Sequence, residues 1–230
     1  HLLRAASVDV ARDYELVEIE RECAWRVVAP YKAVVPVQGA LFRLDDRTLA
    51  LVNPPSIDDA LAARIAALGI VSLIVNTTGG HGDGAARCAA HFPNAALWGT
   101  DARTMHKQPQ LAWTGFLGGD GGGGGGGAAQ QPFANLGLEC YFVDGHYARE
   151  AIVVHRASRT AVITDTLMFA RYDARMSLRF AWYMWLFGMW YGEGVDAADD
   201  AARPLRAQTY NHFIVSDARA MRRALHAALG

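Results

Sequence analysis

The chain has 230 residues, of which 52% are hydrophobic and 20% are charged, and its formal net charge at pH 7 is −1. This composition is that of an ordinary globular protein and is sufficient for one large α/β domain or two small ones. The nearly neutral charge argues against nucleic acid as the main partner, because phosphate binding usually requires an excess of basic residues.

The first half of the chain predicts a hairpin, a helix and a buried strand. Residues 39–55 alternate apolar and polar side chains around a turn at 45–47, which is typical of a β-hairpin. Residues 56–69 predict a helix in which Ser56 is the N-cap and Asp59 completes a capping box. Its apolar stripe consists of Ile57, Leu61, Ile65 and Leu68, and Gly69 ends it.

A glycine-rich loop follows the next predicted strand. Residues 70–78 form a β-branched run that predicts a buried strand, and the loop "GGHGDG" leads into a short helix that ends near His91. A strand at 95–99 and a polar helix at 101–108 come next. Residues 118–131 are a low-complexity linker without the Lys-Ser/Thr ending of a phosphate loop, and they divide the chain into two halves.

The second half repeats the pattern of strands followed by helices. A strand at 138–145 precedes a hairpin that turns at 157–159. After it we expect an aromatic helix, a polar helix, a strand and a last helix capped by Ser216 or Asp217. Strand pairs followed by helices, present twice, predict two sheets face to face with helices outside, a single four-layer α/β/β/α domain over residues 1–230.

The aromatic segment at 180–192 is the most apolar window of the chain. It is shorter than the roughly 20 residues that a transmembrane helix requires, so no transmembrane span is predicted. We interpret it as a packed or lid-forming helix. A peripheral membrane contact, a dimer contact or a partner-docking surface is the alternative, because Trp and Tyr suit a surface with one wet side.

Three cysteines, Cys23, Cys88 and Cys140, lie far apart and form no CxxC pair. Such a sparse, odd set favours buried thiols in a reducing, intracellular compartment over a disulfide framework or a structural zinc site. The chain begins with His1 instead of methionine, and no signal peptide is visible. We therefore expect it to be part of a longer product, which leaves its localisation open.

Histidines and aspartates stand at the ends of several predicted strands. His81 and Asp83 follow the strand at 70–78, and His146 follows the strand at 138–145. Asp165 ends one strand of the second hairpin, and His212 begins the last strand. Imidazole and carboxylate are the usual ligands of zinc and of di-metal hydrolytic centres, so these five residues are candidate metal ligands.

The order and spacing of these residues resemble the metallo-β-lactamase superfamily. Its first motif, Thr-His-x-His-x-Asp-His after a buried strand, falls on residues 78–84. Thr78, His81 and Asp83 match the motif, whereas Gly79 and Gly84 stand where two histidine ligands belong. The resemblance implies an αββα sandwich and a di-metal hydrolytic site.

The later motifs of the superfamily are matched in the second half. Gly145 and His146 match its Gly-His motif, Asp165 matches its bridging carboxylate, and His212 is the best match to its final histidine. The resemblance extends from about Trp25 to the end of the chain. It is strongest to a domain-of-unknown-function branch in which the metal motifs are commonly eroded.

The two glycines imply an incomplete metal site. Gly79 removes one ligand from the first metal, and Gly84 removes one from the second. The resemblance leaves His81, His146 and Asp165 at the first position, and Asp83, Asp165 and His212 at the second. Two nitrogen ligands and a carboxylate can still form a catalytic site with one open position.

Two functions follow from this site. The first is a metal-dependent hydrolase in which one zinc or iron ion polarises an ester, thioester or lactone carbonyl while Asp83 acts as the general base that orients the attacking water. The second is a non-catalytic or weakly active protein with a degenerate metal site, holding one ion or none, that binds a small-molecule ligand or a protein partner, in one version through residues 180–191. The free N–H groups of the glycine loop offer a third role, the binding of an anion.

Overall fold

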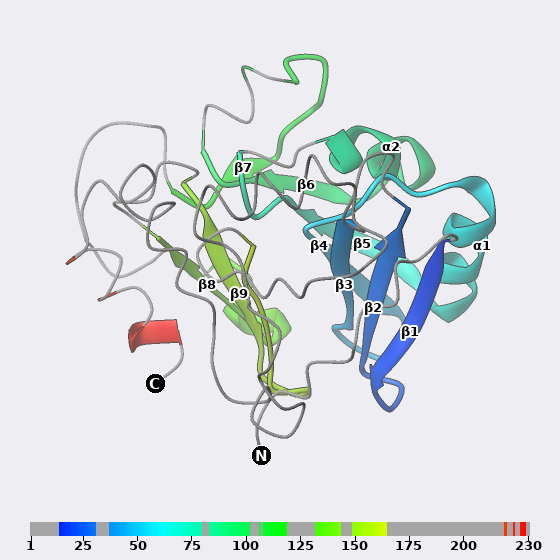
Figure 1. The fold of residues 1–230 in the computed structure, drawn as a ribbon, viewed down its shortest axis with the longest axis horizontal. Helices are drawn as coiled ribbons and strands as arrows, with labels where there is room; N and C mark the ends of the chain where they lie inside the picture. Colours follow the sequence, from blue (N-terminus) through cyan, green and yellow to red (C-terminus); the bar gives the residue numbers. More distant parts are fainter. Residues whose placement is uncertain are drawn as a thin grey trace, which may run out of the picture.

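The computed structural model describes residues 14–30, 37–79, 83–101, 106, 108–118, 132–143, 149–164, 219, 223 and 226–228. These residues form two sheets and two α-helices (Figure 1). In the seven-stranded sheet the spatial order of the strands is their order in the chain: β1 Glu15–Glu20, β2 Ala24–Ala29, β3 Val37–Arg43, β4 Thr48–Val52, β5 Ile70–Val75, β6 Ala96–Gly99 and β7 Gly115–Phe116. The second sheet has the order β10-β9-β8, with β8 at Leu138–Phe142, β9 at Ala151–His155 and β10 at Thr160–Val162.

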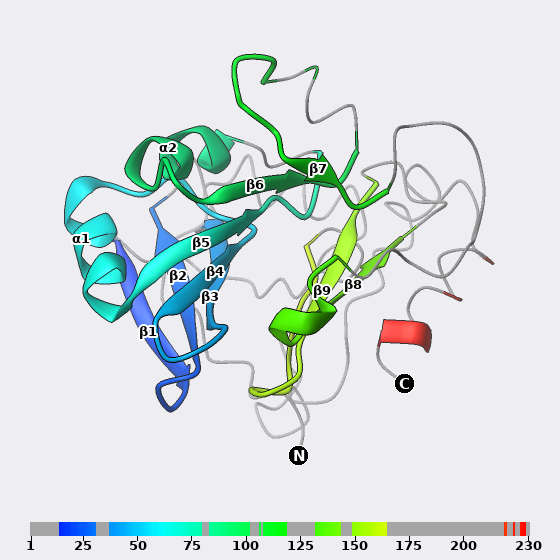
Figure 2. The same cartoon turned by 180° about the vertical axis from the view of Figure 1, so that it is seen from behind.

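The direction of the strands changes once within the seven-stranded sheet. Strands β1 to β4 are antiparallel to their neighbours, whereas β4 to β7 are parallel. The parallel strands need crossover connections, and two of these contain the helices α1 (Asp59–Leu68) and α2 (Asp83–His91). Both helices lie on the same face of the sheet, away from β8 and β9 (Figure 2).

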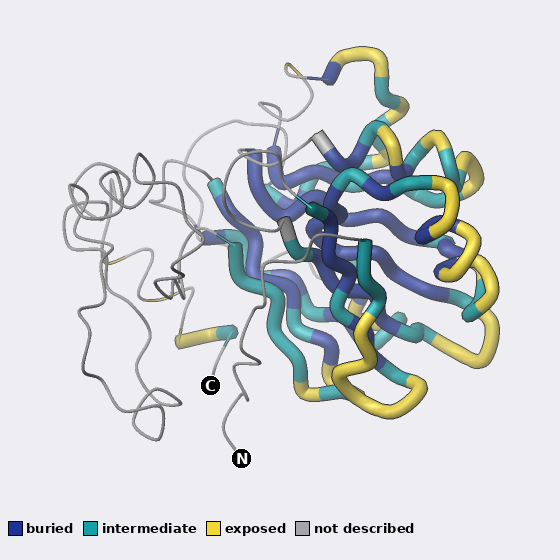
Figure 3. The backbone as a smooth tube through the Cα atoms, turned by 45° about the vertical axis from the view of Figure 1, so that its right-hand side comes forward, coloured by how far each residue is buried: buried dark blue, intermediate teal, exposed yellow. Residues whose placement is uncertain are grey.

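Two layers of apolar side chains hold the sheets and helices together, and the strands between them are the most buried part of the backbone (Figure 3). The inter-sheet core joins the two sheets and includes Phe42, Val52, Leu73, Val75, Leu138, Cys140 and Val153. The helix-side core joins the seven-stranded sheet to α1 and α2 and includes Leu41, Leu51, Ile57, Leu61, Ile65, Ile74, Ala85, Cys88 and Leu97. The described residues therefore provide three layers in the order α/β/β.

The hairpin predicted around residues 45–47 is confirmed as β3 and β4. One carboxylate closes its turn, because Oδ1 of Asp45 accepts hydrogen bonds from the backbone N–H groups of Arg47 at 2.8 Å and Thr48 at 2.7 Å. These hydrogen bonds lower the pKa of Asp45, since they stabilise the ionised carboxylate.

The helix predicted at 56–69 is confirmed as α1, but its predicted N-terminus is wrong. Asp58, and not Ser56, is the N-cap, and its side chain accepts a hydrogen bond from the backbone N–H of Leu61 at 2.8 Å. Asp59 is then the first helical residue, so the capping box does not form. Ile57, which belongs to the predicted apolar stripe, instead precedes the helix and is fully buried in the helix-side core.

The strand at 70–78 and its neighbours are confirmed as β5, α2 and β6. Strand β5 is central, since it pairs in parallel with β4 and β6. Its last three residues, Leu73, Ile74 and Val75, are all buried, so both faces of the strand are covered there, which explains the apolar run in the sequence.

The hairpin of the second half is confirmed as β9 and β10, with its turn at 156–159. His155 is a packing residue, as its place within a hairpin predicts, because it is buried and stacks on Phe42 at 4.7 Å between ring centroids. The sequence did not predict the first hairpin, formed by β1 and β2.

Several predictions fall on residues outside the described part of the chain. They are the linker residues 119–131, the aromatic segment 180–192, the polar helix 196–207 and the strand 212–216. Within the polar helix predicted at 101–108, residue 106 is helical, and residues 219, 223 and 226–228 of the last predicted helix are helical too. Among the described residues no helix is both long and apolar enough to span a bilayer.

Candidate functional site

Polar residues gather where the parallel strands β4, β5 and β6 end. We call this region the carboxyl edge, and it comprises Asn53, residues 76–79, residues 100–101, residues 149–150 and Thr164. Parallel strands end on the same side of a sheet, which brings these residues together although they are far apart in the chain. Most of them are buried: Asn53, Asn76, Thr77, Thr78, Thr100, Asp101 and Glu150.

Hydrogen bonds at the carboxyl edge connect the two sheets. The backbone N–H of Ala151 donates to the carbonyl oxygen of Thr77 at 2.8 Å. The hydroxyl groups of Thr77 and Thr164 are also 2.8 Å apart, and the Glu150 carboxylate accepts a hydrogen bond from the backbone N–H of Thr164. These hydrogen bonds hold three parts of the chain together: the end of β5, the segment before β9 and the segment after β10.

Four of the five predicted metal ligands lie outside the described residues: His81, His146, Asp165 and His212. Asp83 is the first residue of α2, but its side chain is not among those described. Three of the segments that carry these candidates nevertheless meet, because Thr77 precedes the glycine loop, Glu150 follows His146 and Thr164 immediately precedes Asp165. Among the described residues there is no group of three His, Cys, Asp or Glu side chains that would hold a metal ion.

Gly84 is the described residue that bears most directly on the metal site. A Cβ atom at this position would lie 2.5 Å from the carbonyl carbon and 2.7 Å from the carbonyl oxygen of Pro55, and closer still to the carbonyl oxygen of Pro54. Real Cβ atoms do not approach backbone atoms this closely, so only glycine fits here. The backbone here therefore leaves no room for the histidine that the resemblance predicts at this position as a ligand of the second metal.

The helix that carries Gly84 is held firmly in place. Ala85 and Cys88 of α2 are fully buried in the helix-side core, and Sγ of Cys88 lies 3.5 Å from the carbonyl oxygen of Pro55. Burial raises the pKa of the Cys88 thiol to about 12, so it is neutral and serves as a packing residue. The close contact between Gly84 and Pro55 is thus part of a packed layer.

An ion pair at the carboxyl edge was missed in the sequence. Oδ2 of Asp101 lies 2.5 Å from Nε of Arg149, and the guanidinium carbon lies 5.3 Å above the ring centroid of Phe142. The Nε–H does not point at the carboxylate oxygen, so we describe this contact as electrostatic and not as a hydrogen bond. Asp101 follows a predicted strand, as Asp83 does, and the same criterion would have found it.

A second missed residue is Asn76, at the end of β5. Its side chain is 1% exposed, and neither its amide nitrogen nor its amide oxygen has a hydrogen-bond partner in the part of the chain that the structure describes. Buried polar groups in proteins are almost always paired, so this amide requires an explanation.

Comparisons with known proteins identify the fold. No family model matches the sequence, and no curated protein matches it. Among solved structures, the chain is similar to DIM-1 metallo-beta-lactamase, with a TM-score of 0.56 and 12% identity over 94% of this chain and 85% of that one. It is also similar to a metallo-beta-lactamase from Pontibacter korlensis, with a TM-score of 0.52 and 16% identity over 73% of this chain and 80% of that one. The α/β sandwich predicted from the sequence is thereby confirmed, and the chain has the metallo-β-lactamase fold.

Proposed function

We propose that this protein uses the metallo-β-lactamase fold to bind a ligand at the carboxyl edge, with a degenerate metal site that gives little or no hydrolysis. The observation that carries the proposal is the backbone contact between Gly84 and residues 54–55. A histidine there would require α2 or the two prolines to move, and both belong to the packed layer described above. The second metal position of the superfamily is therefore incomplete for a structural reason.

The polar groups of the carboxyl edge support a binding role. Burying Asn76 with no partner among the described residues costs free energy, about 1–3 kcal/mol for an unpaired polar group. Such a group persists where it is needed for something other than stability, and an amide can both donate to and accept from a ligand. The same edge contains the Asp101–Arg149 ion pair, which offers a charged group to a ligand.

A metal-dependent hydrolase with one metal position is the second candidate function. In this proposal His81, His146 and Asp165 hold one zinc or iron ion, which supplies Lewis-acid chemistry at an ester, thioester or lactone carbonyl. The contacts of Thr164 with Thr77 and Glu150 favour it, because they hold the residue before Asp165 beside the strand that leads to the glycine loop. Asp83 would orient the attacking water.

Metal content decides between the two functions. The protein is purified without a histidine tag, loaded with zinc or iron, freed of loose metal and analysed by mass spectrometry. We expect well below one equivalent of metal in the native chain and in Asp165→Ala. Asp46→Ala is the matched control, since Asp46 is an exposed aspartate in the turn between β3 and β4. One tightly held equivalent that Asp165→Ala loses and Asp46→Ala keeps would overturn the proposed degenerate site and favour the hydrolase candidate.

A second arm tests the structural reason. Gly84→His should not increase the bound metal, because its side chain cannot enter without moving the backbone of Pro54 or Pro55. The variant is compared with the native chain for both metal content and folding by circular dichroism. A folded Gly84→His protein that binds an additional equivalent of zinc would contradict this. It would show that the backbone admits a histidine at position 84 and that the second metal position lacks only this ligand.

A further inference from the structure

Arg149 occupies an unusual position at the carboxyl edge. Its guanidinium group lies between the carboxylate of Asp101 and the ring of Phe142. The side chain of Asp101 is 4% exposed, whereas that of Arg149 is 34% exposed. A buried carboxylate thus holds one side of a planar cation while part of the cation remains in contact with solvent.

The described residues use little of the hydrogen-bonding capacity of Arg149. A guanidinium group has five N–H donors arranged as a planar fork. None of the described residues accepts a hydrogen bond from Arg149, and its contact with Asp101 is made through Nε. The two terminal nitrogens are the pair that grips a carboxylate in a bidentate manner elsewhere in proteins, so this arginine is prepared for a second anionic partner.

The backbone at Arg149 is also unusual. Its φ angle is +48°, in the left-handed region that non-glycine residues rarely adopt. Two of the three other such residues, Glu22 and Arg159, belong to hairpin turns, where this conformation is common. Arg149 instead lies two residues before the start of β9. Strained backbone of this kind is often retained where it positions a functional side chain.

Arg149 stands next to the residues that join the two sheets. Glu150 and Ala151 follow it directly, and they bond to Thr164 and Thr77 respectively. Asp101 follows β6, whose parallel neighbour β5 leads into the glycine loop. The cation is therefore at the same edge as the candidate site, and not on a remote surface.

We propose that Arg149 binds the carboxylate group of a small organic ligand, oriented by Asp101 and with Phe142 supplying an apolar contact. This inference rests on the proposed function and deepens it, because it assigns the chemical class of the ligand. A planar carboxylate matches the fork of two guanidinium nitrogens, and the neighbouring ring favours a ligand with an apolar body.

The test measures the binding of benzoate, succinate and inorganic phosphate by ligand-observed NMR at constant ionic strength. The variants are Arg149→Gln and Arg149→Lys. Arg156→Gln is the matched control, because Arg156 also pairs with a carboxylate, that of Glu139, but lies at the far end of the same sheet. We expect Arg149→Gln to weaken benzoate binding at least about tenfold, which corresponds to about 1.4 kcal/mol. Arg149→Lys should retain part of the binding, and Arg156→Gln all of it.

Three outcomes would overturn the inference. They are the absence of carboxylate binding to the native chain, equal binding by native and Arg149→Gln protein, and an equal loss in Arg156→Gln, which would indicate nonspecific attraction. Tighter binding of phosphate than of both carboxylates would reject the assigned ligand class. Metal content is measured on the same preparations. One equivalent of bound metal would refute the proposed function, whereas the dependence of carboxylate binding on Arg149 is judged from the binding data alone. Arg149→Lys keeps the test valid if Arg149→Gln does not fold.

Discussion

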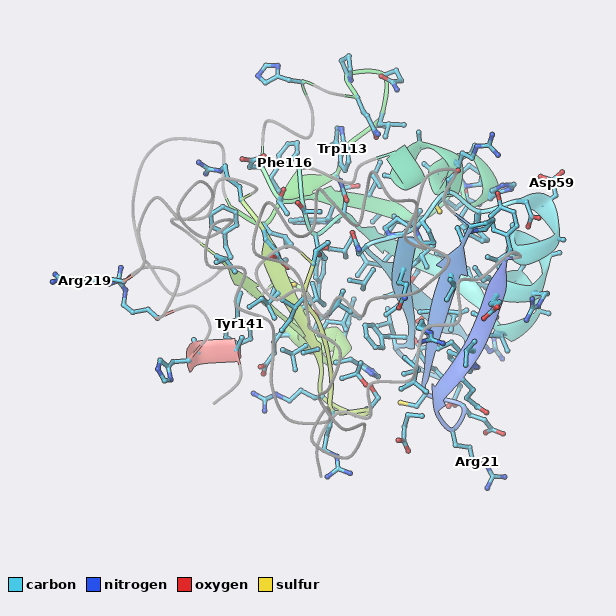
Figure 4. All side chains as sticks on the ribbon, in the orientation of Figure 1. Arg21, Asp59, Trp113, Phe116, Tyr141 and Arg219 are labelled. Carbon is cyan, nitrogen blue, oxygen red and sulfur yellow. The ribbon has the colours of Figure 1, made fainter. Side chains whose placement is uncertain are left out.

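The carboxyl edge and the opposite edge of the same strands accommodate their polar groups in different ways. At the opposite edge, formed by the turns at 21–23, 44–47 and 156–159, the charged groups are mostly in water: Arg156 pairs with Glu139 at 2.6 Å while 69% of its side chain is exposed. Figure 4 shows Arg21 at the tip of one of these turns, at the end of the molecule away from Trp113 and Phe116. At the carboxyl edge, Asp101, Glu150 and Asn76 are almost completely buried.

This difference indicates that the opposite edge serves the stability of the fold, whereas the carboxyl edge is the candidate site. Exposed pairs such as Arg156–Glu139 contribute little to stability, and they leave no buried polar group unsatisfied. Buried groups such as Asn76 and Glu150 reduce stability unless each finds a partner, so their concentration at one edge is evidence of a role beyond folding. The four predictions below test this comparison, from the largest expected effect to the smallest.

Gly84→Ala should cause the largest loss of stability. The added Cβ would collide with backbone atoms of Pro54 and Pro55, and overpacking of this kind costs about 3 kcal/mol. The control at the opposite edge is Gly137→Ala, where φ is +75° but no atom lies within 4 Å of the added Cβ. Backbone strain alone should cost about 1–2 kcal/mol there. Urea unfolding of both variants measures the difference, and equal losses would remove the argument for a closed position at 84.

Glu150→Ala should come second. The carboxylate of Glu150 is fully buried and accepts the backbone N–H of Thr164, so truncation leaves that N–H without a partner and should cost about 2 kcal/mol. Glu139→Ala, which removes a partly exposed partner of Arg156 and Tyr141, should cost clearly less. Chemical denaturation of the two variants provides the comparison. A greater loss in Glu139→Ala would contradict the assigned difference between the edges.

His155 should make stability depend on pH. Burial lowers the pKa of this imidazole below its ordinary value of 6.5, while a hydrogen bond with the backbone of Arg43 partly opposes that effect. Between the two pKa values the unfolded chain binds more protons than the folded one, so stability is complete above about pH 6.5 and decreases as the pH falls toward the folded pKa. The free energy of unfolding of His155→Asn, measured from pH 7.5 downward, should therefore decrease less steeply than that of the native chain. Identical slopes would show that His155 is not the responsible group.

Asn76→Ala should have the smallest effect, although the residue is buried. Loss of packing atoms is offset by removal of an unpaired amide, so the change should remain within about 1 kcal/mol. Asn53→Ala is the contrast at the same edge, because Nδ2 of Asn53 donates to the carbonyl oxygen of Gln38 at 3.0 Å and its φ is +49°. We expect Asn53→Ala to be the more destabilising of the two in thermal unfolding. The reverse order would indicate that Asn76 has a structural partner.

Periodic patterns predicted much of this fold. The hairpin of β3 and β4, helix α1 and strand β5 were predicted because their signals are local: alternation, an apolar stripe and a β-branched run. The N-cap of α1 was not predicted correctly, since Ser56, Asp58 and Asp59 are all residue types that can cap a helix. In the structure Ile57 is buried before the helix begins, and Asp58 is the cap.

The described part of the candidate site was less predictable for a different reason. Thr77 and Thr164 are 87 positions apart, and Asp101 follows β6 of one sheet whereas Arg149 precedes β9 of the other. Their pairing follows from how two sheets stack, which no local pattern contains. Asp101 also follows a predicted strand, but the sequence places it at the start of the helix predicted at 101–108, so it was not among the candidate residues.

The order of the strands in the larger sheet has a consequence for how the chain folds. Because β1 to β7 are neighbours in space in the same order as in the chain, the contacts of this sheet connect segments that are close in sequence. Pairing of nearby segments costs little loop entropy, although the parallel pairings of β4 to β7 require longer crossovers than the hairpins do. The bonds of Thr77 with Ala151 and Thr164 require the second sheet, which is synthesised later. We therefore expect the carboxyl edge to be completed last, so that a nascent or truncated chain contains a formed sheet before it contains a site.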